Sequence, residues 1–155
     1  MIIFLKEENK MVLFKSKNKI SVVIFAVIAM LAVGLFGCTY GFPKGFDKDE
    51  CIKKAEEIIN IVNTKDYDAV HAFLRDDLEE KVTAEDFKQS WESKLNKIGE
   101  FKKFGKPVLS GEMEKDTGKE FAMVVYYCYY EAGEAIYTVY FDSDMEMTSI
   151  SMQLD

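Results

Sequence analysis

The chain has 155 residues, 48% of them hydrophobic and 30% charged, and a formal net charge of −7 at pH 7. This length allows one domain with or without a targeting segment, and the composition suits a globular protein. The acidic balance excludes nucleic acid as a partner, because contacts with phosphate need positive charge and supply most of that affinity.

The first 37 residues are typical of a secretory signal. Five lysines precede an apolar run of 18 residues, Ile20 to Gly37, which contains no charged side chain. A basic start, an apolar run and small residues at its end form the signal-peptide pattern. The run would be roughly 27 Å long as a helix, so it would also suffice for an uncleaved single-pass anchor.

The end of the run favours cleavage before a lipidated cysteine. Leu35, Gly37 and Cys38 resemble the lipobox of bacterial lipoproteins, although Phe36 stands where a smaller residue is usual. The resemblance implies a signal peptide over residues 1–37 and acylation of Cys38. Acyl chains bind a lipid bilayer with about 0.8 kcal/mol per buried methylene group. We therefore expect a lipid-anchored protein on the extracytoplasmic side of the cell membrane.

A tether and an acidic domain are expected after this anchor. Gly41, Pro43 and Gly45 oppose regular structure, so residues 38–46 are expected to form a flexible tether. The signal peptide contains 5 of the 20 Lys and Arg and 2 of the 27 Asp and Glu, which leaves 15 and 25 and a net charge of −10 for the rest. The domain, residues 47–155, is therefore not expected to lie flat on anionic lipid.

Three helices are expected in the first half of the domain. Residues 47–62 place apolar side chains at helical spacing, and a shorter helix is expected at residues 67–74. Thr83 suits the N-cap of a third helix, with Asp86 three residues on, and Gly99 ends that helix. The apolar face of the third helix consists of Phe87, Trp91, Leu95 and Ile98.

Strands are expected after the third helix. Residues 100–113 predict a weak strand that an internal glycine and proline bend or confine to a sheet edge. Residues 120–154 predict three strands, joined by two-residue turns at residues 132–133 and 143–144.

These turns assign a register and two faces to the sheet. They place Cys128 opposite Tyr137, and Tyr137 opposite Ile150. The face expected to carry the helices comprises Ala122, Val124, Tyr126, Cys128, Tyr130, Tyr137, Val139, Phe141, Ile150 and Met152. The opposite face comprises Phe121, Met123, Val125, Tyr127, Tyr129, Ile136, Thr138, Tyr140, Ser149 and Ser151.

The order of these elements resembles the nuclear transport factor 2-like superfamily, in particular uncharacterised bacterial lipoproteins with one such domain. Residues 63–104 carry the likeness most clearly, and it extends over residues 47–155. The resemblance implies an α+β fold, in which N-terminal helices pack on a strongly curved antiparallel sheet and form a cone with a pocket. It names no activity, because this fold serves many functions.

Catalytic residues are not expected. Enzymes of that superfamily place an acid or a histidine inside the cone, beside a tyrosine or a second acid. The one histidine, His71, is expected to be structural, and Asp142 and Glu146 lie at a strand end, where acids are usually solvated. Cys51 and Cys128 fall on core-facing stripes, which favours two buried thiols, although a disulfide is allowed outside the cytoplasm. Neither a metal site nor a cofactor is expected.

Tyrosine is the most distinctive feature, with six tyrosines within residues 126–140. Sheet stabilisation alone explains them, because tyrosine favours strands and its hydroxyl group can reach water. Two functional alternatives stand beside this explanation. A pocket for a small apolar ligand would be lined by Trp91, Tyr126, Tyr130 and Tyr137. A contact with an envelope protein, or a homodimer through the sheet face, would use Tyr127, Tyr129 and Tyr140.

Two functions therefore fit the sequence. The favoured function is a non-enzymatic ligand-binding or protein-interaction module, because no pair of titratable side chains is expected to converge. The alternative is a small cofactor-free isomerase or cyclase that acts on an apolar substrate in the cone.

The substitution Cys38→Ser should block lipidation and leave the precursor uncleaved, because the lipobox resemblance makes this thiol the acylation site. Metabolic labelling with a palmitate analogue measures the effect: the wild-type protein should carry label and the variant none. Thr39→Ser, one residue further on, is the matched control and should keep the label. Label that persists in the Cys38→Ser protein would contradict the lipoprotein assignment.

Overall fold

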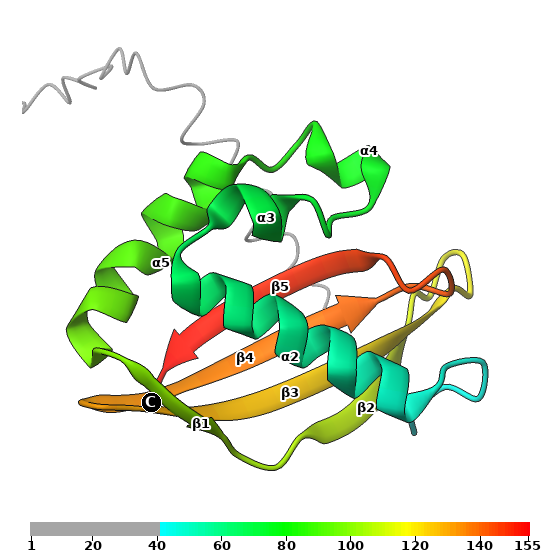
Figure 1. The fold of residues 1–155 in the computed structure, drawn as a ribbon. Coiled ribbons are helices and arrows are strands. Elements are labelled where there is room, and N and C mark those ends of the chain that lie inside the picture. Colours follow the sequence, from blue (N-terminus) through cyan, green and yellow to red (C-terminus); the bar gives the residue numbers. More distant parts are fainter. Residues whose placement is uncertain (1–40) are drawn as a thin grey trace, which may run out of the picture. The chain divides into compact units, whose positions relative to one another are not determined.

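The computed structural model describes residues 41–155 (Figure 1). Cys38 and the expected signal peptide lie outside the described residues, so cleavage and lipidation stay predictions. None of the helices within the described range has the length and apolar character that are needed to cross a membrane.

Local signals explain where the helices begin and end. The carboxylate of Asp47 accepts a hydrogen bond from the backbone N–H of Glu50 at the start of the first described helix. Thr83 and Asp86 form the expected capping box, and Gly99 ends the same helix with a φ of 79°. The described helices are α2 (Lys48–Thr64), α3 (Tyr67–His71), α4 (Asp76–Glu79) and α5 (Ala84–Ile98).

The described strands form one antiparallel sheet, which is not closed. Their order is β1-β3-β4-β5, and β2 also pairs with β3, so β1 and β2 share one edge. This confirms the expected interruption. The backbone N–H of Gly105 donates to the carbonyl oxygen of Tyr127, and a Cβ at this glycine would lie 2.8 Å from that oxygen. The strands are β1 (Phe101–Phe104), β2 (Val108–Met113), β3 (Glu120–Tyr130), β4 (Gly133–Phe141) and β5 (Met147–Leu154).

The two faces of the sheet are those expected from the alternation of residues, and the α+β fold is confirmed. Figure 1 shows α2 lying across the sheet, with α3 and α5 on the same side. The helix-covered inner face of β3 and β4 is buried throughout and comprises Ala122, Val124, Tyr126, Cys128, Tyr130, Ala135, Tyr137, Val139 and Phe141. The outer face is half-buried or exposed and comprises Phe121, Met123, Val125, Tyr127, Tyr129, Ile136, Thr138 and Tyr140.

The turn between β3 and β4 lies one residue earlier than expected. Residues 131–132 form it, so Cys128 pairs with Ala135 rather than with the residue two positions later. Gly133 was expected in the turn, but its role is different. A Cβ there would lie 3.1 Å from a methyl group of Ile98, so this glycine lets α5 pack closely on β4. Moving a two-residue turn by one position changes each partner by two, and the two faces are therefore kept.

The hairpin between β4 and β5 also differs from the expected register. Tyr137 pairs with Met152 rather than with Ile150. Residues 143–144 lie in the turn as expected, but Met145 follows them in the left-handed region with a φ of 62°. A methionine rarely takes this conformation, so its presence at this position does not indicate the longer loop.

Part of the segment expected to be a flexible tether packs on the sheet. Pro43 is buried, and a Cβ at Gly111 of β2 would lie 2.6 Å from its ring. Phe42 and Phe46 are partly buried against the core, with ring centroids 6.4 Å apart. The packing of the domain therefore begins at Phe42, and the glycine in β2 leaves the space that the proline occupies.

The core lies within the described residues. Its buried cluster runs from Cys51 to Met152, so a fragment of residues 39–155 contains all of it. Trp91 is a central member, since it is 4% exposed and its ring stacks on Phe87 at a centroid distance of 4.8 Å.

Trp91→Ala should lower the free energy of unfolding by about 3–5 kcal/mol, the range for removing a large buried aromatic side chain. Urea unfolding of the 39–155 fragment measures the change. Ser93→Ala, on the exposed side of the same helix, should change stability by less than about 0.5 kcal/mol. Equal unfolding midpoints for wild type and Trp91→Ala would show that this contact does not stabilise the domain.

Candidate functional site

The tyrosines of the inner face are core residues whose hydroxyl groups bond inside the protein. The hydroxyl of Tyr126 donates to the carboxylate of Glu56 at 2.6 Å. The hydroxyl of Tyr130 donates to Oδ1 of Asn63 at 2.6 Å and lies 2.8 Å from that of Tyr137. Because the single hydroxyl hydrogen of Tyr130 is used on Asn63, Tyr137 is the donor in the second bond.

Burial holds these hydroxyl groups in the neutral form. Desolvation raises the pKa of Tyr130 to about 12, and it raises the pKa values of Tyr126 and Tyr137 as well. The nearby carboxylate of Glu56 adds to the rise for Tyr126, because it repels a phenolate. At neutral pH all three tyrosines therefore act as hydrogen-bond donors.

Of the four residues predicted to line a ligand pocket, three pack inside the core and one lines the pocket that the structure describes. Trp91 contacts Phe87 and lies 6.5 Å, between ring centroids, from Tyr67. Tyr126 and Tyr137 are 1% and 0% exposed, so their side chains are packed inside the core. Tyr130 also faces a pocket, described next, and it is the single member of the predicted set that lines it.

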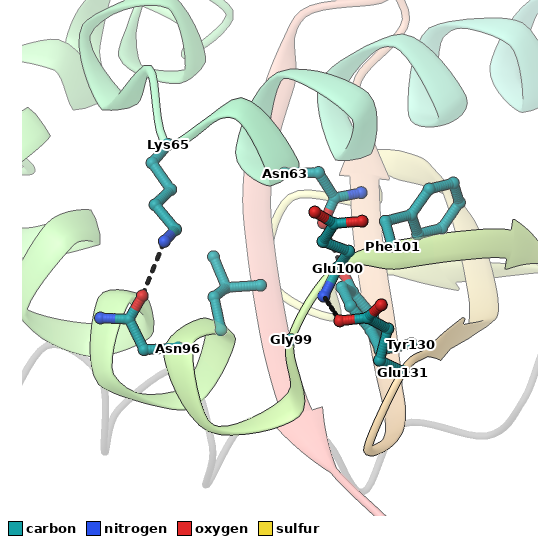
Figure 2. A pocket seen from close by; sticks show the side chains of 9 residues that line it. Asn63, Lys65, Asn96, Gly99, Glu100, Phe101, Tyr130 and Glu131 are labelled. Atoms are coloured by element: carbon teal, nitrogen blue, oxygen red, sulfur yellow. Dashed lines mark hydrogen bonds between the residues drawn. The ribbon is translucent and has the colours of Figure 1, made fainter.

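This pocket lies where the C-terminal ends of α2 and α5 meet the start of β1 (Figure 2). Its volume is about 310 Å³. It is lined by Asn63, Lys65, Leu95, Asn96, Gly99, Glu100, Phe101, Tyr130 and Glu131. No sequence pattern indicates this pocket, because residues 63–66 are typical of a break between two helices and Gly99 is typical of a helix end.

Several hydrogen bonds fix the polar groups of the pocket. Lys65 donates through Nζ to Oδ1 of Asn96 at 2.6 Å, and the backbone N–H of Glu100 donates to the carboxylate of Glu131 at 3.3 Å. Both bonds are drawn in Figure 2. A Cβ at Gly99 would lie 2.9 Å from an oxygen of Glu131, so this glycine lets the carboxylate pack across the backbone.

The outer face presents the other three tyrosines. Tyr127 is 41% exposed, and Tyr129 lies beneath Lys103, whose Nζ is 5.1 Å from the ring centroid. Tyr140 is half-buried, and burial together with the nearby carboxylate of Glu112 raises its pKa. The three residues predicted as an interface therefore lie on one face of the sheet, with a lysine beside one and a glutamate beside another.

His71 and Asp142 have structural partners. Nε2 of His71 donates to the backbone carbonyl oxygens of Glu79 and Val82, at 3.1 and 2.8 Å, so it joins α3 to the end of α4 and to the loop that follows. The carboxylate of Asp142 accepts from the backbone N–H groups of Asp144 and Glu146 at the β4–β5 turn. These bonds hold loops in place. Asp142 is 8% exposed, so the expectation that this acid is solvated is wrong.

The two cysteines of the described domain are free and buried. Sγ of Cys51 lies 3.7 Å from Sδ of Met145. Burial raises the pKa of Cys51 to about 11 and that of Cys128 to about 12, so neither thiol is activated. Within residues 41–155 no group of three or more His, Cys, Asp or Glu side chains is arranged to hold a metal ion.

The fold and its interior define a small α+β domain whose buried tyrosines bond to one helix. Residues 55–150 match the model of the family described as "Protein of unknown function (DUF3887)", so the chain belongs to the DUF3887 family. The chain is also similar to a protein from Ruminococcus gnavus ATCC 29149 with a solved NMR structure, at 34% sequence identity and a TM-score of 0.65. That match covers 74% of this chain and 97% of the other. No curated protein matches the chain.

The domain should lose stability in alkaline solution. The pKa values of Cys51, Cys128 and Tyr130 are raised in the fold, so the unfolded chain releases these protons first, from about pH 9 upward. The contribution of these protonated side chains to the free energy of unfolding is complete below that pH, and it falls as the pH rises toward 12. Urea unfolding at about pH 8 and about pH 11 measures the decrease.

Cys128→Ala should make this decrease smaller, because one of the buried thiols is removed. Tyr127→Phe is the matched control on the exposed face and should leave the decrease unchanged. Equal free energies of unfolding at the two pH values would contradict the assignment.

Proposed function

We propose that this chain is a membrane-anchored extracytoplasmic lipoprotein whose nuclear transport factor 2-like domain works by binding rather than by catalysis. The lipobox-like residues that end at Cys38 support the anchor. The packed domain begins at Phe42, and four extended residues span at most about 14 Å. An acylated Cys38 would therefore keep the domain next to the bilayer.

The contrast between the two sets of tyrosines carries the binding proposal. The inner tyrosines are buried and hydrogen-bonded, which leaves them no free group for a substrate. On the other side of the sheet, Tyr127 is 41% exposed and Val108, on β2, is 52% exposed. Val108 pairs with Val125, two residues from Tyr127, so these side chains form a neighbouring apolar group. Contiguous apolar surface can serve as a contact site, and we propose that this group is the centre of one.

The charges beside the outer tyrosines suit a second copy of the chain as the partner. Lys103 lies over Tyr129, and Glu112 lies near Tyr140, so opposite charges flank the two ends of this surface. In a two-fold dimer, a residue away from the axis that contacts a second residue of the other copy is matched by the reciprocal contact. Lys103 of each copy would then face Glu112 of its partner.

One observation favours the alternative, an isomerase-type or cyclase-type enzyme. Glu56 and Tyr126 form an acid–tyrosine pair with a 2.6 Å hydrogen bond, the kind of pair that such chemistry needs. Neither residue lines the pocket of Figure 2, and Tyr126 is 1% exposed. A substrate would have to displace core packing to reach this pair, so the binding function is the better supported one.

Tyr129→Glu should convert a dimer into a folded monomer, because it places a charge in the contact between the two copies. The free energy of unfolding should change little, since this side chain lies on the partly exposed outer face. Tyr137→Glu, on the inner face, is the contrasting control: it buries an unpaired carboxylate and should unfold the domain. Sedimentation and circular dichroism of the 39–155 fragment measure the two effects. A wild-type fragment that is monomeric at high concentration would rule out the homodimer.

A further inference from the structure

Met145 attaches the loop between β4 and β5, residues 142–146, to the start of α2. Its Sδ lies 3.7 Å from Sγ of Cys51, whose thiol is the donor. Its backbone carbonyl oxygen accepts a hydrogen bond from Nζ of Lys54 on the same helix. In the described part of the chain, no other residue of this loop makes a hydrogen bond to α2. The attachment of the loop to the helix therefore depends on Met145.

The backbone of Met145 is strained. Its φ of 62° lies in the left-handed region, which a methionine rarely adopts. Its N–H donates to the backbone carbonyl oxygen of Asp142 at 3.0 Å, and the carboxylate of Asp142 accepts from two N–H groups later in the loop. A strained residue keeps its conformation only where several surrounding contacts impose it. Loss of the contact between Met145 and Cys51 would remove one of these constraints.

The carboxylates of the loop repel one another. Desolvation and the nearby carboxylates, first that of Asp142, raise the pKa of Glu146. Asp76 and Asp144 add to this repulsion. Like charges at short range favour a conformation in which they move apart, so the repulsion opposes the packed loop. The contacts of Met145 with α2 act in the opposite sense and hold the loop in place.

Met145 is more exposed than the methionines of the core. It is half-buried, whereas Met147 and Met152 are 0% and 3% exposed. Two further half-buried methionines, Met113 and Met123, belong to β2 and β3. Oxidation requires contact between the oxidant and the sulfur, and it turns a flexible apolar side chain into a polar one. At Met145 this change would fall on the contact between a loop and a helix.

We propose that Met145 is an oxidation site for hydrogen peroxide, and that its oxidation releases the β4–β5 loop from α2. A lone pair of Sδ attacks one peroxide oxygen and the O–O bond breaks. The proton of the transferred oxygen moves to the leaving oxygen, which departs as water. The sulfur is thereby oxidised by two electrons to the sulfoxide, and the peroxide is reduced.

The added oxygen needs space beside Cys51, which is 0% exposed and closely packed. Because a packed interior has no room for an extra atom, the loop must move away from the helix. Repulsion among its carboxylates and relief of the backbone strain both favour this movement. Neither Tyr127 nor Tyr129 takes part, so the proposal goes beyond the sheet-face interaction and is independent of it.

The test is treatment of the folded 39–155 fragment with millimolar hydrogen peroxide, followed by peptide mass spectrometry and hydrogen exchange. Met145 should gain one oxygen before Met147 and Met152 do. The backbone amides of residues 142–147 should then exchange at least about tenfold faster. The urea midpoint of the oxidised fragment should fall by about 0.5 M. The proposal is overturned if Met145 stays unmodified while Met113 and Met123 are oxidised, or if its oxidation leaves the exchange unchanged.

Variants separate Met145 from the other methionines. Met145→Leu keeps an apolar side chain of similar volume without a sulfur, so peroxide should no longer speed exchange in residues 142–147. Met123→Leu, on the outer face, is the matched control and should respond to peroxide as wild type does. Met145→Gln places a polar group at the same position and should show fast exchange without peroxide. A Met145→Leu protein whose loop still responds to peroxide would overturn the proposal.

Discussion

The fit between α2 and the inner tyrosines is the interaction on which the rest of the domain depends. The hydroxyl group of a buried tyrosine usually finds a hydrogen-bond partner, and α2 supplies two, Glu56 for Tyr126 and Asn63 for Tyr130. Glu56 and Asn63 are seven positions apart, which is about 10 Å along a helix. Tyr126 and Tyr130 are four positions apart, which is about 13 Å along a strand. Because these distances are similar, both hydrogen bonds can form only if α2 runs along β3. These two bonds therefore fix the position of the helix on the sheet, which hydrophobic packing alone specifies weakly.

Local patterns in the sequence predicted most of the fold. The alternation in β3 and β4 identified both faces, and the capping residues Thr83 and Asp86 identified the start of α5. The register was wrong at both hairpins for physical reasons that are not local. Gly133 serves the approach of Ile98, which comes from another element, and the left-handed Met145 has no residue-type signature. Turn positions thus depended on contacts that only the assembled fold contains.

The candidate site was less predictable than the fold. Side-chain alternation correctly indicated that Tyr130 points inward, but no pattern indicates that its hydroxyl reaches Asn63 on α2. The pocket forms where the ends of α2 and α5 meet β1, and its lining comes from separate parts of the chain. Asn63 and Lys65 looked like residues that end a helix, and they do end one. Their second role appears only when Glu100 and Glu131 are brought beside them.

The contacts between the two ends of the domain also constrain the order of folding. Cys51 and Met145 touch although they are 94 positions apart, and the backbone of Met147 bonds to both Phe73 and Arg75. The first helices therefore complete their packing only after the last strand is available. Contacts at such long sequence separation carry a large loop-closure cost and slow folding. A domain that begins to fold while it is being synthesised would accordingly remain incompletely packed until almost the whole chain is available.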